Sequence, residues 1–129
     1  MSDLKTRILH VEDDRSLQRV VRVALEQLGG YEVRTAADGF AALDSARQFP
    51  PQLVLLDLDL PGMSGVDTLR ALREIDGLRR VPVVFLTAAA DPRVLEELRS
   101  LGVQDVLRKP FRPRPLVEAL ARILERKET

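Results

Sequence analysis

The sequence predicts an α/β domain in which helices cover both faces of one open parallel sheet. Five short apolar runs alternate along the chain with amphipathic segments. Most of the runs are continuously apolar, as expected for strands that are buried on both faces. The connections between them are too long for β-hairpins, which favours right-handed crossovers through helices. Together these observations indicate a doubly wound domain.

The strands and helices are predicted in strict alternation. The apolar runs that predict strands cover residues 8–11, 31–35, 53–56, 83–86 and 106–107. The first helix carries apolar side chains at helical spacing from Leu17 to Leu28, with Asp14 as its cap and Gly29-Gly30 at its end. Further helices are expected from 37–39 onward, after Ser64-Gly65, from Asp91-Pro92 to Gly102, and along the stripe at 116–124.

Length and composition exclude several classes of protein. The chain has 129 residues with 45% hydrophobic content, which fits one domain with one core. The 20 basic and 20 acidic residues balance, so the overall charge attracts neither nucleic acid nor an anionic membrane. There is no cysteine, which excludes disulfides and thiolate chemistry, and no apolar run approaches the roughly 20 residues of a membrane span. We therefore expect a cytoplasmic protein with no direct nucleic-acid or membrane partner.

Polar residues gather at the carboxyl ends of four predicted strands, where open parallel sheets bind their ligands. These strand ends carry Glu12-Asp13-Asp14, Asp57, Thr87 and Lys109-Pro110. Lysine is scarce in this chain, occurring only at residues 5, 109 and 127 among 20 basic residues. A lysine at the same edge as an acidic cluster therefore indicates a functional site.

The acidic cluster requires a compensating cation. If the carboxylates of Glu12, Asp13 and Asp57 approach to about 4 Å, each like-charge pair costs about 4 kcal/mol at an effective dielectric constant near 20. A hard divalent ion with oxygen ligands meets this need. Mg²⁺ suits a site that has few carboxylates and leaves coordination positions for water and phosphate. The sequence therefore predicts a magnesium site at this edge of the sheet.

Four segments carry a resemblance to a known family. They are Val11-Glu12-Asp13-Asp14, residues 55–65 around Asp57, residues 85–88 ending in Thr87-Ala88, and Lys109-Pro110-Phe111. In this order and on these strand ends they resemble the response-regulator receiver domains of two-component signalling, from about residue 7 to residue 125. The resemblance implies a flavodoxin-like fold, with a five-stranded parallel sheet in the order 2-1-3-4-5 and five helices.

The resemblance also implies roles for individual residues. Asp57 would be the phosphoacceptor that forms an aspartyl phosphate. Asp13 would bind Mg²⁺, or Mn²⁺ in its place, directly, Glu12 would orient the metal through water, and Asp59 would contribute its backbone carbonyl. The phosphoryl oxygens would be contacted by the Thr87 hydroxyl, the Ala88 amide and the Lys109 amine.

The implied protein is a switch and not a conventional enzyme, because it catalyses only its own phosphorylation and dephosphorylation. The donor would be a phosphohistidine on a sensor histidine kinase or a histidine phosphotransfer protein. The downstream protein target is not encoded in these motifs. We expect a monomer or a phosphorylation-dependent dimer, and a single receiver domain over residues 1–129 with no visible output domain, either as a stand-alone regulator or as part of a larger one.

Two positions depart from the family pattern. Receivers often carry an aromatic residue three positions before the lysine, where this chain has Val106, so we expect the threonine-aromatic coupling to be absent or rerouted. Two residues after the nucleophile stands Asp59, whose carboxylate could affect metal binding or the hydrolytic water. Asp14 is expected to act only as a helix cap, and His10 as a hydrogen-bonded core residue without a chemical role.

Two alternatives come from other classes of protein. A pseudo-receiver would keep the fold as an interaction module that is never phosphorylated, against which stands the intact set of acids, threonine and lysine. A phosphatase similar to the haloacid dehalogenase superfamily would use Asp57 as nucleophile and Asp59 as general acid. Those enzymes usually place their paired metal-binding acids after the lysine, whereas here the acids precede Asp57.

Overall fold

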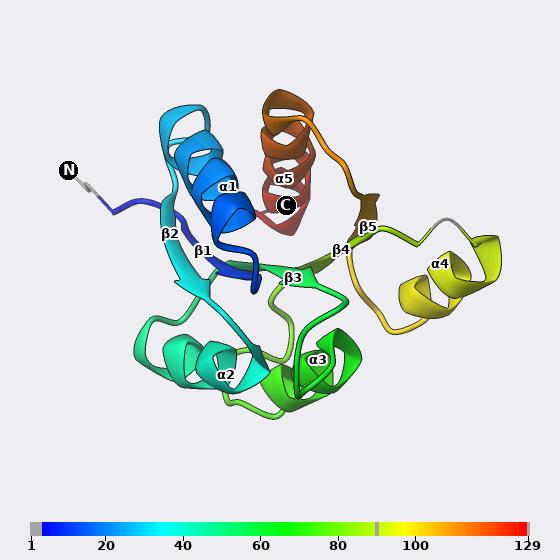
Figure 1. The fold of residues 1–129 in the computed structure, drawn as a ribbon. Helices are drawn as coiled ribbons and strands as arrows, with labels where there is room; N and C mark the ends of the chain where they lie inside the picture. The colour runs from blue at the N-terminus through cyan, green and yellow to red at the C-terminus, as the bar shows by residue number, and fades with distance from the viewer. Residues whose placement is uncertain (1–3, 90, 129) are drawn as a thin grey trace.

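The computed structural model describes residues 4–89 and 91–128, which form one five-stranded parallel sheet with helices on both faces (Figure 1). The strands are β1 (Arg7–Val11), β2 (Glu32–Ala36), β3 (Leu53–Asp57), β4 (Val83–Thr87) and β5 (Asp105–Arg108). Their order is β2-β1-β3-β4-β5, as the resemblance implied. The differences from prediction are small. β2 begins and ends one residue later than predicted, so Tyr31 precedes it, and the other four strands are longer by one or two residues, β3 and β4 by including Asp57 and Thr87.

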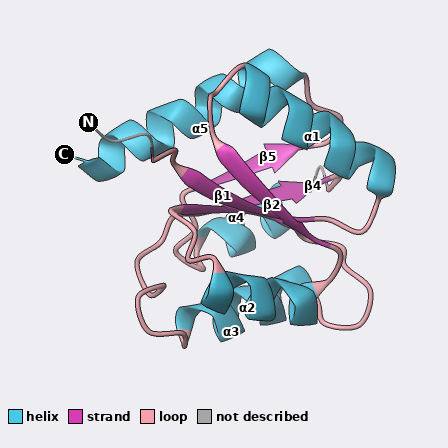
Figure 2. Ribbon diagram, turned by 90° about the vertical axis from the view of Figure 1, so that its left-hand side faces the viewer, coloured by secondary structure: helices cyan, strands magenta, loops and turns pink. Residues whose placement is uncertain are grey.

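Five helices complete the alternation. They are α1 (Arg15–Gln27), α2 (Gly39–Gln48), α3 (Gly65–Arg73), α4 (Pro92–Arg99) and α5 (Pro113–Glu128). Helices α1 and α5 lie on one face of the sheet, while α2 and α3 lie on the other (Figure 2). Helix α4 contacts β5 at the end of the sheet, on the side of α2 and α3. The described residues contain no helix that is long and apolar enough to cross a membrane.

Short polar side chains determine where four of the helices begin. Asp14 accepts from the Leu17 amide at 3.0 Å, Asp38 from Ala41 at 2.8 Å, Ser64 from Asp67 at 3.1 Å and Asp91 from Arg93 at 2.9 Å. Each such cap satisfies an amide that has no partner inside the helix. The predicted cap at Asp14 is therefore confirmed. So is the glycine after α1, because Gly30 has a φ of +70°, a left-handed conformation that glycine adopts without steric cost.

Two apolar clusters hold the layers together, one on each face of the sheet. Alternate residues of each strand point to opposite faces, so Ile8 packs toward α1 and α5 while Leu9 packs toward α2 and α3. All five residues of β3 and all five of β4 are buried. This explains why both strands are continuously apolar up to the polar residue at the end.

The strand register determines what meets at the carboxyl edge. Val11 is paired with Leu56 and Asp57 with Leu86, which places Glu12, the next residue of the chain, beside Asp57. Thr87 is paired with Arg108, and the Lys109 amide donates to the Thr87 carbonyl at 2.8 Å. Residues that lie far apart in the sequence therefore converge at one edge.

Candidate functional site

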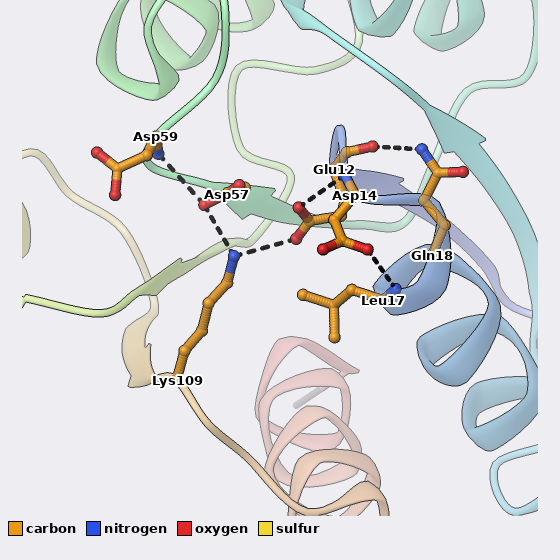
Figure 3. A network of polar contacts seen from close by, with 7 residues as sticks. All are labelled: Glu12, Asp14, Leu17, Gln18, Asp57, Asp59 and Lys109. Carbon is orange, nitrogen blue, oxygen red and sulfur yellow. Dashed lines mark hydrogen bonds and ion pairs between the residues drawn. The ribbon is translucent and has the colours of Figure 1, made fainter.

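The centre of the site is an ion-paired cluster of Glu12, Asp57 and Lys109 (Figure 3). Asp57 is the last residue of β3, while Glu12 and Lys109 directly follow β1 and β5. The Lys109 ammonium nitrogen Nζ lies 3.2 Å from Oε1 of Glu12 and 3.2 Å from Oδ1 of Asp57. Both carboxylate side chains are buried, with exposed fractions of 2% and 4%, while the lysine side chain retains 23%. The lysine thus bridges two carboxylates that would otherwise repel each other in a medium of low dielectric constant.

A third carboxylate, that of Asp13, completes an acidic pocket. Glu12, Asp13 and Asp57 each offer one carboxylate oxygen, and these three oxygens lie within 4.8 Å of one another. Asp13 is exposed, so the pocket opens to solvent on that side. Three converging carboxylate oxygens with an open side are the donor set that a hard divalent cation prefers, and Mg²⁺ would keep water or phosphate at its remaining positions. The residues present therefore fit the predicted metal.

Burial and charge shift the pKa values within the cluster. Burial raises the pKa of the Glu12 carboxyl, and the neighbouring Asp57 charge adds to this, against the opposing effects of the Asp14 amide and Lys109. For Lys109, burial lowers the pKa, but the attraction of Asp57 and Glu12 outweighs it and raises the pKa overall. Lys109 is therefore a fixed positive charge at neutral pH.

Thr87 lies at the end of β4, and its hydroxyl group is engaged locally. The exposed fraction of Thr87 is 1%, and its Oγ1 accepts a hydrogen bond from the Ala89 amide at 3.0 Å. Ala88, the other residue predicted to contact phosphate, is exposed directly after the strand. The structure brings both residues to the edge that carries Asp57 and Lys109. Their roles toward a phosphoryl group stay predictions.

Asp59 contributes its backbone to the site through the amide, which donates to Oδ1 of Asp57 at 3.2 Å. The same oxygen contacts Lys109, so both of these interactions hold one oxygen of the predicted phosphoacceptor. The Asp59 carboxylate is exposed and points away from Lys109 and Glu12 (Figure 3). The predicted metal contact through its backbone carbonyl stays a prediction.

Val106, the residue at the predicted switch position, belongs to the apolar core. Its exposed fraction is 6%, it is paired with Phe85 of β4, and it shares its cluster with Leu98 of α4. A small aliphatic side chain therefore occupies the space between the sheet and α4. Whether this alters the response to phosphorylation stays a prediction.

Some contacts at the site were not predicted from the sequence. The Asp14 amide donates to Oε2 of Glu12 at 3.2 Å, so Asp14 holds the acidic cluster in addition to capping α1. The side-chain amide of Gln18 donates to the Glu12 backbone carbonyl at 2.5 Å. A glutamine in the first turn after an acidic strand end is the only sequence signal for this contact, and it is a weak one.

His10 is fully buried, as predicted, but the expected hydrogen bond is missing. Among the interactions of residues 4–89 and 91–128, neither ring nitrogen has a partner. Burial, with smaller contributions from Lys109 and Arg22, lowers the pKa of His10 to about 3, so the ring is neutral at physiological pH.

A doubly wound sheet that carries three carboxylates and a lysine at its carboxyl edge is the architecture of a signalling receiver domain. Comparison with known proteins agrees. The family model of the response regulator receiver domain matches residues 8–121. The DNA-binding response regulator MtrA of Mycolicibacterium smegmatis is 42% identical over 129 residues, which cover 99% of this chain and 54% of that protein. Chemotaxis protein CheY-3 of Vibrio cholerae is 34% identical over 120 residues, covering 93% of this chain and 92% of that protein.

Solved structures give the same result. Chemotaxis protein CheY4 of Vibrio cholerae superposes with a TM-score of 0.85 at 33% identity, covering 92% of this chain and 98% of the other. A CheY-like receiver domain protein of Methanospirillum hungatei superposes with a TM-score of 0.83 at 28% identity, covering 96% and 97%. The chain belongs to the response regulator receiver domain family. It spans about half the length of the MtrA relatives, at 54%.

Membership in this family places the chain in two-component signal transduction. Receiver domains of response regulators interact with histidine kinases and downstream effectors, and they generally bind Mg²⁺ at an acidic pocket. Because the chain belongs to the receiver family, the alternative of a phosphatase similar to the haloacid dehalogenases is set aside.

Proposed function

We propose that the chain is a phosphoacceptor switch that takes a phosphoryl group onto Asp57 in a Mg²⁺-dependent reaction. The observation that carries this proposal is the convergence of three carboxylates and one lysine. The carboxylate oxygens of Glu12, Asp13 and Asp57 lie within 4.8 Å, and Lys109 lies 3.2 Å from two of the three side chains. Packing of the apolar core does not require such a cluster. Burying like charges without a compensating ligand lowers the stability of the fold.

In the proposal, Asp13 and Asp57 bind the metal directly and Glu12 orients it through water, with the Asp59 carbonyl as a further ligand. When bound, Mg²⁺ supplies charge neutralisation for the phosphoryl oxygens, and Mn²⁺ can do the same. The pocket suits this because Glu12 is held at both carboxylate oxygens, by Lys109 and by the Asp14 amide. Because both of its carboxylate oxygens are held, Glu12 has a fixed position beside the proposed metal site.

The chain's own residues carry the transfer. A carboxylate oxygen of Asp57 forms a bond to phosphorus while the bond from phosphorus to the donor's imidazole nitrogen breaks, and that nitrogen keeps the electron pair. Oδ1 of Asp57 already accepts from Lys109 and the Asp59 amide, so we assign the attack to Oδ2. Lys109 then moves its ammonium group from Glu12 and Asp57 to a phosphoryl oxygen, where it stabilises the charge that has been added.

In the proposed switch, Thr87 would change its hydrogen bonding when Asp57 is phosphorylated, and water would later remove the phosphoryl group. Turning the Thr87 hydroxyl to a phosphoryl oxygen would replace the bond from the Ala89 amide, and this would change the connection between β4 and α4. The Ala88 amide would contact another phosphoryl oxygen. The donor would be a phosphohistidine on a histidine kinase or phosphotransfer protein in the cytoplasm, and hydrolysis of the aspartyl phosphate would return the chain to its resting state.

Intact-mass measurement after incubation with acetyl phosphate tests the proposal. We expect one added phosphoryl group in the presence of Mg²⁺, none with EDTA, and none in Asp57→Asn. The variant Asp76→Asn makes the same change at an exposed site away from the pocket and should be labelled like the native chain. A chain that never gains mass would be a pseudo-receiver, and labelling that survives in Asp57→Asn would assign the wrong acceptor.

A further inference from the structure

Gln18 of α1 makes a side-chain contact with the acidic pocket, and the proposed function gives this residue no role. Its Nε2 donates a hydrogen bond to the backbone carbonyl of Glu12 at 2.5 Å (Figure 3). Its backbone amide donates to the Asp14 carbonyl at 2.9 Å, which holds Gln18 within the first turn of α1. The side chain thus reaches back from the helix to the end of β1.

The carbonyl that Gln18 binds belongs to the peptide group joining Glu12 to Asp13. A peptide group is planar, so the direction of the carbonyl determines the direction in which the chain enters Asp13. On the other side of the residue, the Glu12 amide donates to the Ala36 carbonyl at 2.9 Å. Gln18 and Ala36 therefore fix the backbone of Glu12 from both sides.

Asp13 depends on this peptide group more than its neighbours do. The carboxylates of Glu12 and Asp57 are buried and are held in place by Lys109, whereas Asp13 is exposed. The position of the Asp13 carboxylate therefore follows mainly from the backbone that carries it. A rotation of the peptide group would move this carboxylate relative to the other two.

We propose that Gln18 is a positioning residue of the acidic pocket, which fixes the peptide group before Asp13 and so sets the affinity of the three carboxylates for a divalent cation. This inference rests on the proposed function, since it assumes that the pocket binds Mg²⁺. Gln18 itself does not contact the metal. It acts through the backbone of Glu12.

The role requires a hydrogen-bond donor at the end of the side chain. Leucine has a similar size but no donor, so Gln18→Leu leaves the Glu12 carbonyl to bind water or to turn. Histidine can donate from a ring nitrogen without a charge at pH 8, so Gln18→His tests rescue. Gln27→Leu is the matched control, because Gln27 is an exposed residue of the same helix, nearer its other end.

The experiment measures the Mg²⁺ dissociation constant by calorimetric titration at pH 8, together with the melting temperature of the metal-free protein. We expect Gln18→Leu to raise the dissociation constant about fivefold, the equivalent of about one net hydrogen bond. Gln18→His should return it to within about twofold of the native value, and Gln27→Leu should leave it unchanged. Gln18→Ala removes the donor without bulk and repeats the measurement if Gln18→Leu does not fold.

The outcomes separate this role from a merely structural one. A native dissociation constant in Gln18→Leu and Gln18→Ala, even with a lower melting temperature, would reduce Gln18 to a stabiliser of α1. Failure of Gln18→His to restore affinity, or an equal loss in Gln27→Leu, would also overturn the positioning role. If the native chain itself binds no Mg²⁺, the proposed function fails first and the role of Gln18 falls with it.

Discussion

The Lys109 ammonium nitrogen lies 3.2 Å from the Asp57 carboxylate, and the same nitrogen lies 3.2 Å from Glu12, a residue 97 positions earlier in the chain. One cation is thus shared between two buried anions. Because Lys109 also retains solvent contact, it can leave these partners without becoming a buried unpaired charge. The resting contact and the proposed contact with a phosphoryl oxygen are therefore alternatives for one side chain.

Replacing Lys109 by methionine should separate metal binding from phosphoryl transfer. Removing the positive charge makes the pocket more negative, so Lys109→Met should bind Mg²⁺ more tightly than the native chain. Its labelling by acetyl phosphate should fall by about tenfold or more, because the negative charge on the phosphoryl oxygens loses a partner. Calorimetric titration and the rate of mass gain measure the two effects. Lys5→Met, at an exposed site, should change neither, and weaker Mg²⁺ binding in Lys109→Met would contradict the electrostatic argument.

Gly65 is required because the loop after β3 passes close to it. A Cβ atom at this position would lie 2.7 Å from the Asp57 carbonyl oxygen and 2.8 Å from the Cα of Leu58. Gly65→Ala should therefore push the backbone of Asp57 outward, lower the free energy of unfolding by about 1–3 kcal/mol and weaken Mg²⁺ binding. Urea denaturation and metal titration measure both. Gly77→Ala carries a cost of its own at a φ of +88°, but it should lower stability with no change in metal affinity.

His10 should make the fold sensitive to mild acid. Its pKa is about 3 in the folded chain against 6.5 when unfolded, so the unfolded chain takes up this proton first as the pH falls. The contribution of the neutral ring to stability is complete above about pH 6.5 and decreases down to about pH 3, by about 2 kcal/mol at pH 5. His10→Leu should lose this part of the pH dependence. Urea denaturation of both proteins at pH 7 and pH 5 measures it, and parallel pH profiles would contradict a neutral buried ring.

The architecture was predictable because its signals are local. Each apolar run needs only its own residues to indicate a buried strand, and Asp14 or Asp91 needs only the next turn to act as a cap. The edge at which Asp57 and Lys109 meet also followed, since parallel strands place their carboxyl ends together. The strand order and the assignment of roles came from resemblance to a family, and not from the residues alone.

The contacts that were not predicted depend on the orientations of side chains across packed elements. Gln18 binds a carbonyl on another element, and the Thr87 hydroxyl turns to the Ala89 amide. Nothing in the sequence distinguishes these orientations from others that the same side chains can adopt. His10 illustrates the limit most clearly, because a polar residue in an apolar strand indicates a hydrogen bond, and packing has left its ring without one among the described residues.

Asp59 should affect the pocket through charge and not through direct contact. Its carboxylate is exposed and points away from Lys109, while its backbone amide contacts Asp57. Asp59→Asn preserves the backbone and removes one negative charge, so we expect weaker Mg²⁺ binding or a changed lifetime of the phosphorylated state, by about twofold to fivefold. Calorimetry and the decay of the phosphorylated mass measure these. If both match the native values, as they should in Asp76→Asn, the side chain has no functional role.

Substitutions at Val106 test whether the threonine-aromatic coupling of the family is absent or rerouted in this chain. It is packed against Phe85 and the cluster that includes Leu98, so the larger side chain of Val106→Tyr would have to displace α4 or turn outward, at a cost of about 1–3 kcal/mol in stability. Asp57 and Lys109 lie at the carboxyl ends of β3 and β5, and Asp57 should still accept a phosphoryl group. We expect Val106→Tyr to be labelled by acetyl phosphate while the lifetime of the phosphorylated state changes.

Val106→Ile adds volume without an aromatic ring and should retain the native lifetime. A native lifetime in Val106→Tyr would mean that this position does not couple to the site.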